Sequence, residues 1–370
     1  MKLVCDRAKL LEAFSLASAV VPSRTPKPIL ENVRLKVEDS RAYLEATDLE
    51  IGLRIEASGI EVHVPGEVLL PVRRFGSILR EVPDETLTLE ASGEQLLVRG
   101  LRSEFQLPTP DPLEYPPILS GNREGYVITT GKVLHNLVRR TSFAIDPDSP
   151  HYALGGIYLE FGGDRIYAVG TDGRRLAAQE GSARLVGEPR VNWVVALPQA
   201  LRLVDRAVGS SDDSLHLCPQ ETLLEIWGES FTVVSRLIEG RFPPWREVLP
   251  KTPAAVRFAM SAGYLLGGVR QAQIVADPNA PGVIFDLRPG RLVLSARGHS
   301  TGEGRIELTV EYEGQEARVR LNPRYLTDFL GTLDAETILN VEFRGTKSPV
   351  LFTTEDGYTY ILMPMALEGE

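Results

Sequence analysis

The most constraining feature of this sequence is a pattern that occurs three times along the chain. An apolar strand end, a proline and a short amphipathic helix follow one another around Pro71, Pro198 and Pro323. These prolines are separated by 127 and 125 residues. Proline suits the first turn of a helix, because the N–H that it lacks has no partner inside the helix there. The regular spacing predicts three structural repeats of one design, with helices over residues 71–82, 198–208 and 323–333.

Each predicted repeat also opens with an amphipathic helix, and strand-like segments follow it. Apolar residues at helical spacing predict the opening helices over residues 7–20, 132–143 and 262–274. Segments that alternate and end at Gly or Asp turns are typical of half-buried antiparallel strands. They are predicted at residues 29–37, 42–47, 156–161, 165–170, 282–287 and 291–296.

These repeats predict an α+β protein of three domains, each with helices on one side of antiparallel sheets. Segments rich in Pro and Gly place the boundaries so that the domains span residues 1–122, 123–252 and 253–370. A chain of 370 residues agrees with this number, since a domain usually has ~100–200 residues. Hydrophobic residues at 43% and charged residues at 24% are ordinary for globular domains.

Several protein classes are excluded by what the sequence lacks. Charged residues near the start, such as Asp6 and Lys9, leave no apolar core for a signal peptide. No run of ~18 apolar residues occurs, so no membrane-spanning segment is expected. Cys5 and Cys218 are too far apart in the sequence for a metal or redox motif. These features predict a cytoplasmic protein without a membrane partner, a metal or another cofactor.

Catalytic motifs are also missing, since neither a nucleophile elbow nor H-E-x-x-H nor C-x-x-C occurs. Thr47-Asp48 and Thr171-Asp172 take equivalent positions in the first two repeats. They could be catalytic or metal-binding carboxylates, or turns in which Asp caps its own backbone. The third repeat has Arg297-Gly298 there, which favours the turns. We therefore predict a protein that is not an enzyme.

The overall charge and the distribution of charge along the chain lead to different predictions about binding to nucleic acid. A net charge of −10 and a pI near 5.2 argue against binding to nucleic acid. The six predicted helices, however, carry a net charge of +7. If they share one face, that face would attract phosphates without reading bases. The alternative is that their arginines are ordinary solvated positions.

Seven short segments, spread over nearly the whole chain, then form a specific combination. They are Met1-Lys2-Leu3, Lys27-Pro28-Ile29-Leu30, Thr47-Asp48-Leu49-Glu50, Thr171-Asp172-Gly173-Arg174-Arg175-Leu176, Gly240-Arg241-Phe242-Pro243, Val248-Leu249-Pro250-Lys251 and Met363-Pro364-Met365. In this order and spacing they resemble the bacterial DNA polymerase sliding clamps, the beta subunits of the replicative DNA polymerase.

The resemblance implies a processivity factor that catalyses nothing. Two copies would form a head-to-tail dimeric ring, with helices lining the hole and sheets outside. Positive helices would then face duplex DNA without sequence specificity, and the acidic exterior would discourage binding elsewhere. The implied partners are a second copy of the chain, the catalytic subunit of the replicative polymerase, the clamp loader, and other polymerases and repair proteins that carry short clamp-binding peptides.

The resemblance and the helix charges together suggest three groups of site residues. The expected DNA contacts are Arg24, Arg73, Arg139, Arg140, His151, Tyr152 and Arg202. The expected peptide pocket is formed by Leu154, Thr171, Gly173, Arg174, Arg175, Leu176, Pro243, Val248, Ile361, Met363, Pro364 and Met365. The expected dimer interface comprises Arg74, Ile78, Phe105, Leu107, Ile274, Val275 and Glu303.

Some of these residues allow another interpretation. Phe105 and Leu107 could cover their own domain, and the methionines near the C-terminus could be ordinary core. The chain also departs from the family at Arg174, where His is common, and at Glu247, where a basic residue is common. Added negative charge could shift the peptide preference toward basic flanks. The competing functions are a ring-shaped or peptide-binding scaffold without DNA, and a hydrolase that uses Asp48 and Asp172.

Overall fold

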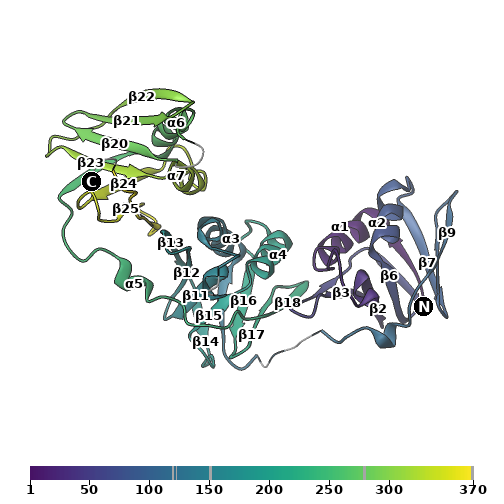
Figure 1. The fold of residues 1–370 in the computed structure, drawn as a ribbon. Coiled ribbons are helices and arrows are strands. Elements are labelled where there is room, and N and C mark those ends of the chain that lie inside the picture. The colour runs from purple at the N-terminus through teal and green to yellow at the C-terminus, as the bar shows by residue number, and fades with distance from the viewer. Residues whose placement is uncertain (119–120, 122, 150–151, 278–280, 368–370) are drawn as a thin grey trace. The chain divides into compact units, whose positions relative to one another are not determined.

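The computed structural model describes residues 1–118, 121, 123–149, 152–277 and 281–367 (Figure 1). Their contacts group into two units. Unit 1 comprises Met1–His135, Gly162–Asp164 and Ala183–Leu237, and unit 2 comprises Asn136–Phe161, Arg165–Ser182 and Ile238–Glu370. No helix among the described residues is both long and apolar enough to cross a bilayer.

All six predicted helices are present, and each begins within two residues of its expected start. The helices are α1 (Arg7–Ser18), α2 (Val72–Glu81), α3 (Gly131–Thr141), α4 (Pro198–Val208), α5 (Trp245–Val248), α6 (Ala262–Gln273) and α7 (Pro323–Leu330). Pro198 and Pro323 are the first residues of α4 and α7, as predicted, whereas Pro71 is the N-cap of α2. The short helix α5 was not predicted.

Unit 1 contains two antiparallel sheets. The smaller has the order β5 (Ile60–Val64), β1 (Lys2–Asp6), β7 (Thr86–Ser92), β8 (Gln95–Arg99) and β9 (Glu104–Pro108). The larger has the order β14 (Arg184–Val186), β10 (Tyr126–Thr130), β16 (Ser214–Pro219), β17 (Leu223–Trp227), β18 (Phe231–Arg236), β4 (Ile51–Glu56), β3 (Arg41–Thr47), β2 (Asn32–Glu38) and β6 (Gly66–Pro71). The strand β15 (Trp193–Ala196) leads into α4.

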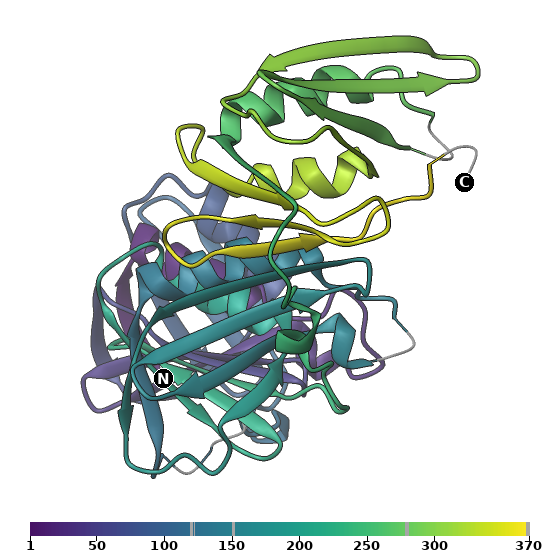
Figure 2. The same cartoon turned by 90° about the vertical axis from the view of Figure 1, so that its left-hand side faces the viewer.

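Unit 2 also contains two antiparallel sheets. One runs in the order β11 (Ile157–Gly162), β12 (Arg165–Thr171), β13 (Arg175–Ser182), β26 (Thr359–Leu362), β25 (Val350–Thr353), β24 (Ile338–Phe343) and β19 (Val256–Ser261). The other runs in the order β22 (Gly302–Thr309), β21 (Arg291–Gly298), β20 (Val283–Arg288) and β23 (Ala317–Leu321). Figure 2 shows α6 and α7 lying between the strands of this second sheet and β24 and β25.

Consecutive repeats are joined by hydrogen-bonded strands. The second repeat contributes β18 to the larger sheet of unit 1, where Val233 lies opposite Leu53 of the first repeat. In unit 2, β13 of the second repeat pairs with β26 of the third, and Leu176 lies opposite Ile361. These pairings explain why three sequence repeats give two contact units. The exact domain boundaries stay a prediction.

The cores form where the predicted apolar faces meet. In unit 1, Phe14 of α1 and Phe75 of α2 are buried and meet edge to face, with ring centroids 5.1 Å apart. In unit 2, Phe329 of α7 stacks on Tyr360 of β26 at 4.2 Å. Burial raises the pKa of the Tyr360 phenol well above its usual value, so its hydroxyl stays protonated and donates to the Tyr325 carbonyl at 2.9 Å.

The Thr-Asp turns have the capping geometry that the favoured interpretation predicted. Oδ1 of Asp48 accepts from the backbone N–H groups of Glu50 and Ile51 at 2.9 and 2.7 Å. Oδ1 of Asp172 accepts from those of Arg174 and Arg175 at 2.8 and 2.9 Å. Each carboxylate thus holds its own turn.

The first of these turns contains a strained residue. Leu49 has a φ of 79°, and the equivalent residue of the second turn is Gly173 with a φ of 81°. Positive φ is unfavourable for a side chain with a Cβ and free of that penalty for glycine.

We predict that Leu49→Gly raises the free energy of unfolding by about 0.5–1 kcal/mol, because relief of the strained φ exceeds the added chain entropy of glycine. The midpoint of urea unfolding measures this change. Leu101→Gly is the control, since Leu101 is 84% exposed and is not among the residues with positive φ. A lower midpoint for Leu49→Gly would contradict the prediction.

Candidate DNA-contacting, peptide-binding and interface surfaces

The twelve residues of the expected peptide pocket all belong to unit 2, and we call them the peptide surface. They come from the 3₁₀ turn at Tyr152–Gly155, from the turn between β12 and β13, from the segment around α5 and from the end of β26. The backbone N–H of Met363 donates to the Arg174 carbonyl at 2.9 Å, which fixes the C-terminal segment beside the turn. The structure thus brings segments that are far apart in the sequence into one unit.

The side chains of the peptide surface differ in how accessible they are to a ligand. Val248 and Met363 are large apolar side chains that stay 43% and 41% exposed. Leu176 and Ile361 are only 3% and 1% exposed, so they form the floor beneath the surface. The remaining residues, Arg175 aside, include exposed Gly173, Arg174 and Pro243, half-buried Leu154, Pro364 and Met365, and buried Thr171.

Arg175 has a structural role that the sequence did not reveal. Its guanidinium donates to Asp172 Oδ2 at 3.0 Å, to Asp328 Oδ2 at 2.8 Å and to the Phe143 carbonyl at 2.6 Å. It also lies over the Tyr325 ring, 4.3 Å from the centroid. With its side chain only 9% exposed, Arg175 supports the peptide surface from inside.

The expected DNA contacts lie on separate elements. Arg73, Arg139 and Arg202 are exposed on α2, α3 and α4, and Arg24 is exposed in the loop after α1. None of these four side chains has an ion pair or hydrogen bond with another described residue. Tyr152 is the first residue of a 3₁₀ turn at Tyr152–Gly155, and His151 lies outside the described residues.

Arg140 differs from its neighbour Arg139. Its side chain is 13% exposed, and its guanidinium donates to Asp356 Oδ2 at 2.5 Å and to the side-chain oxygen of Gln179 at 2.7 Å. Although burial disfavours ionisation of Asp356, hydrogen bonds from Thr354 and Arg140 hold the pKa of that carboxyl below its usual value. The charge of Arg140 is neutralised inside unit 2, so the geometry argues against a DNA contact there.

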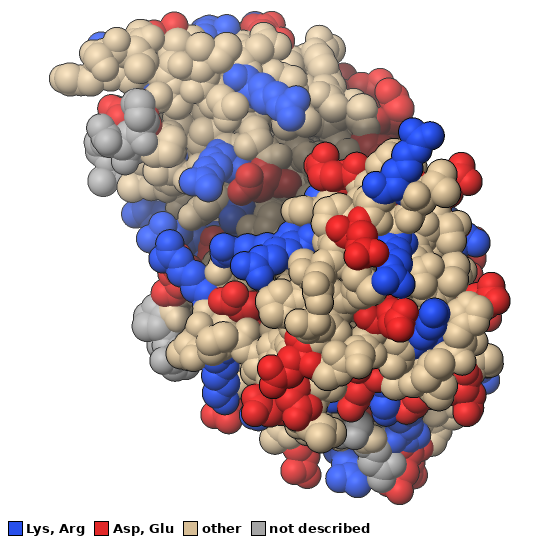
Figure 3. Space-filling view, turned by 90° about the vertical axis from the view of Figure 1, so that its right-hand side faces the viewer, with Lys and Arg blue, Asp and Glu red and all other residues tan. Residues whose placement is uncertain are grey.

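The charges on the surface are more mixed than the helix sums predict. On the face shown in Figure 3, Lys and Arg side chains alternate with Asp and Glu, so no single sign covers that face. Several strand arginines are paired with carboxylates, such as Arg54 with Glu38 at 3.5 Å and Arg288 with Asp286 at 2.8 Å. Exposed pairs of this kind contribute little to stability, but they neutralise positive charge away from the helices.

The expected interface residues lie on two edge strands and on or beside two helices, one strand and one helix in each unit. In unit 1, β9 is an edge strand, with Leu107 buried and Phe105 half-buried, while on α2 Arg74 is exposed and Ile78 is buried. In unit 2, β22 is an edge strand with an exposed Glu303. At the end of α6, Ile274 is 75% exposed and Val275 is half-buried. Phe105 and Ile274 therefore offer apolar surface, whereas Ile78 and Leu107 mainly serve their own unit.

Models of three successive domains match this chain in order. The N-terminal, central and C-terminal domains of the DNA polymerase III beta subunit match residues 1–120, 129–244 and 246–366. This chain belongs to the DNA polymerase III beta subunit family. The members of this family are the beta sliding clamps, accessory subunits of the polymerase rather than enzymes.

Named relatives and solved structures agree with this assignment. The beta sliding clamp of Caulobacter vibrioides is 30% identical over 379 residues, covering 99% of this chain and 100% of the relative. That of Escherichia coli K12 is 28% identical over 374 residues, with the same coverage. The sliding clamp of Pseudomonas aeruginosa bound to griselimycin has a TM-score of 0.93 at 27% identity, covering 99% of this chain and 100% of that chain.

We predict that Arg175→Met lowers the free energy of unfolding by about 3–5 kcal/mol, because it leaves the carboxylates of Asp172 and Asp328 without their shared cation. Arg174→Met is the matched control, since Arg174 is exposed, and its effect should stay within about 0.5 kcal/mol. Adding Asp328→Asn to Arg175→Met should recover part of the loss. Denaturant unfolding monitored by circular dichroism measures all three variants, and equal losses for Arg174→Met and Arg175→Met would refute the structural role.

Proposed function

We propose that this chain works as a sliding clamp in which two copies close head to tail into a ring around duplex DNA. Retention then comes from enclosure, so the ring can slide while it tethers a replicative polymerase to its template. The full-length match to the three domains of the beta subunit is the observation that carries this proposal. The clamp loader, other polymerases and repair proteins would share the same ring, and this role places the protein in the bacterial cytoplasm.

The sheet edges support the head-to-tail closure. Inside the chain, consecutive repeats are joined by pairing an edge of one sheet with an edge of the next, as β18 does with β4. Pairing β9 of one copy with β22 of another would join two chains by the same kind of contact between edge strands. Because β9 belongs to unit 1 and β22 to unit 2, such a contact joins different surfaces of the two copies. Phe105 and Ile274 would supply its apolar contacts.

The exposed helix arginines support the contact with DNA. Arg73 and Arg202 lie on the second helix of the first and second repeats, Arg139 lies on the opening helix of the second repeat, and each is exposed. Long flexible cations that have no partner among the described residues suit phosphates and carry no information about base sequence. We therefore keep Arg24, Arg73, Arg139 and Arg202 as proposed DNA contacts, with His151 and Tyr152, and leave Arg140 out.

The peptide surface supports the binding of partners. Exposed Met363 and half-buried Met365 can repack around different side chains, which suits a surface that serves several partners. The side chain of Glu247, next to Val248, is exposed, and this favours peptides with basic flanks.

The competing functions receive less support. In a hydrolase, Asp48 and Asp172 would have to be available for chemistry, but each caps its own turn, and Asp172 also bonds to Arg175. No group of three or more His, Cys, Asp or Glu that could hold a metal occurs among the described residues. A scaffold without DNA remains the alternative that the next experiment separates.

We predict that the protein is retained on nicked circular DNA and released when that DNA is cut to a linear form, because only an encircling ring depends on free ends. Ile274→Asp should weaken the dimer by about 100-fold or more and abolish retention, since it buries a charge at the proposed interface. Analytical ultracentrifugation and gel filtration on loaded DNA measure the two effects.

The matched control for this experiment is Ile338→Asp, because Ile338 is also exposed, at 49%, and lies on β24 outside the proposed interface. It should leave both the dimer and the retention unchanged. Equal retention on circular and linear DNA would rule out encirclement and favour binding in a groove or no functional ring at all.

We predict that Val248→Asp weakens the binding of a clamp-binding peptide by about 10–100-fold, because a carboxylate replaces an apolar contact. Val64→Asp is the control, since Val64 is 49% exposed on β5 in unit 1. Fluorescence anisotropy of a labelled peptide from the polymerase measures both variants. Unchanged affinity for Val248→Asp would place the peptide elsewhere.

A further inference from the structure

A cavity of about 530 Å³ lies at the junction of the first and second repeats, inside unit 1. It is bounded by the end of α1, by the turn at Asp48 and by α4. Its walls are formed by Ala19, Val20, Val21, Pro22, Asp48, Glu50, Ile51, Leu197, Gln199, Arg202, Leu203 and Arg206. Of its lining residues, only Arg202 belongs to a surface described above, as a proposed DNA contact.

The junction of the second and third repeats shows what fills the equivalent place there. Arg175 occupies it, between Asp172 of the turn and Asp328 of α7, with Tyr325 beneath the guanidinium. Asp328 and Tyr325 stand five and two residues after Pro323, the first residue of α7. The helix and the turn together thus form a socket for an arginine side chain.

The first junction keeps the turn carboxylate of this socket, as Asp48, but has no arginine and a different helix side. Counting from Thr47 and from Pro198 in the same way, Ile51 replaces Arg175, Leu203 replaces Asp328 and Ala200 replaces Tyr325. Each replacement is shorter than its counterpart or lacks its charge. Ile51 and Leu203, at the positions that Arg175 and Asp328 take in unit 2, both border the cavity of unit 1.

The acidic end of the cavity has retained its carboxylate. Asp48 caps its turn through Oδ1, as Asp172 does. In the second repeat the other carboxylate oxygen, Asp172 Oδ2, accepts a hydrogen bond from Arg175. Within the described part of the chain, Oδ2 of Asp48 receives no hydrogen bond. Exposed Glu50 adds a second carboxylate at this end.

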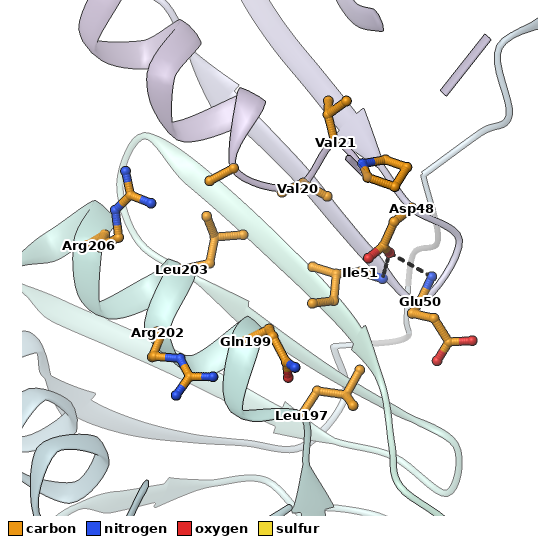
Figure 4. A pocket seen from close by; sticks show the side chains of 12 residues that line it. Val20, Val21, Asp48, Glu50, Ile51, Leu197, Gln199, Arg202, Leu203 and Arg206 are labelled. Atoms are coloured by element: carbon orange, nitrogen blue, oxygen red, sulfur yellow. Dashed lines mark hydrogen bonds between the residues drawn. The ribbon is translucent and has the colours of Figure 1, made fainter. Parts of the chain in front are cut away.

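The opposite end of the cavity is basic. Figure 4 shows Arg202 and Arg206 on the α4 side and Asp48 and Glu50 on the other, with Ile51 and Leu203 between them. Neither arginine side chain has an ion pair or hydrogen bond with another described residue. An arginine that approached alone would meet these cations, so the complementary ligand carries a carboxylate as well as a guanidinium.

We propose that this cavity binds an arginine side chain of a partner protein, followed by an acidic residue. The guanidinium donates a hydrogen bond to Oδ2 of Asp48, and the aliphatic part of the arginine side chain lies along Ile51 and Leu203. The carboxylate of the neighbouring acidic residue pairs with Arg202 and Arg206. A charge-assisted pair that is partly shielded from water is the strongest contact of this kind, which makes arginine a better fit than lysine. A phosphate would match only the basic end.

Titration of the full-length protein with acetyl-Gly-Arg-Glu-amide tests the proposal. We expect this peptide to bind at least about tenfold more tightly than acetyl-Gly-Leu-Glu-amide or acetyl-Gly-Arg-Gln-amide, because each of these loses one charged contact. Isothermal titration calorimetry measures the affinities. No binding of the first peptide, or equal affinity for all three, would overturn the proposal, as would displacement of the peptide by inorganic phosphate alone at equal strength.

A filled-cavity variant gives an independent check. Ile51→Arg with Leu203→Asp rebuilds the socket of the second junction, so it should abolish binding of acetyl-Gly-Arg-Glu-amide while leaving retention on circular DNA unchanged. If this variant does not fold, Glu50→Gln, on an exposed side chain at the acidic end, should weaken the binding about threefold or more. Undiminished binding in whichever variant folds would place the peptide outside the cavity.

Discussion

The structure depends on strand pairing between consecutive repeats. Each repeat ends a sheet with an edge whose backbone groups need partners, and the next repeat supplies them, through β18 and β4 in unit 1 and through β13 and β26 in unit 2. The ladders continue into the Thr-Asp turns, where Arg236 donates its N–H to the Glu50 carbonyl at 2.8 Å and Met363 donates to that of Arg174 at 2.9 Å. The peptide surface and the cavity of unit 1 both lie beside these turns because the pairing fixes them there.

The two turns also show how one backbone design serves different purposes. Both hold their Asp carboxylate by the same two backbone hydrogen bonds, and they differ in the side chain that follows. Arg175 closes the second junction with a buried ion-pair network, whereas Ile51 leaves the first junction open. A buried cation needs partners on every side, so the two junctions differ both in the turn residue, Arg175 or Ile51, and in its helix partner, Asp328 or Leu203.

Neighbouring arginines likewise differ in what they can do. Arg139 is exposed on α3, while Arg140, one residue later, is held by Asp356 and Gln179 and lies over the Tyr358 ring. A sum of helix charges counts both equally. Only an exposed side chain such as Arg139 can bind a phosphate without first giving up contacts inside the protein. The number of cations available to DNA is therefore smaller than the sequence suggests.

Local patterns along the chain were enough to predict the repeat architecture, because helical and strand periodicity and proline at helix starts are local properties. They correctly placed α1, α2, α3, α4, α6 and α7 and favoured the turns at Asp48 and Asp172. Tertiary structure alone decided which charges are free, since Arg175 finds Asp328 and Arg140 finds Asp356 across more than 150 residues of chain. It also decided that Ile51 borders a cavity, because a void depends on what distant segments fail to fill, and no local pattern records that.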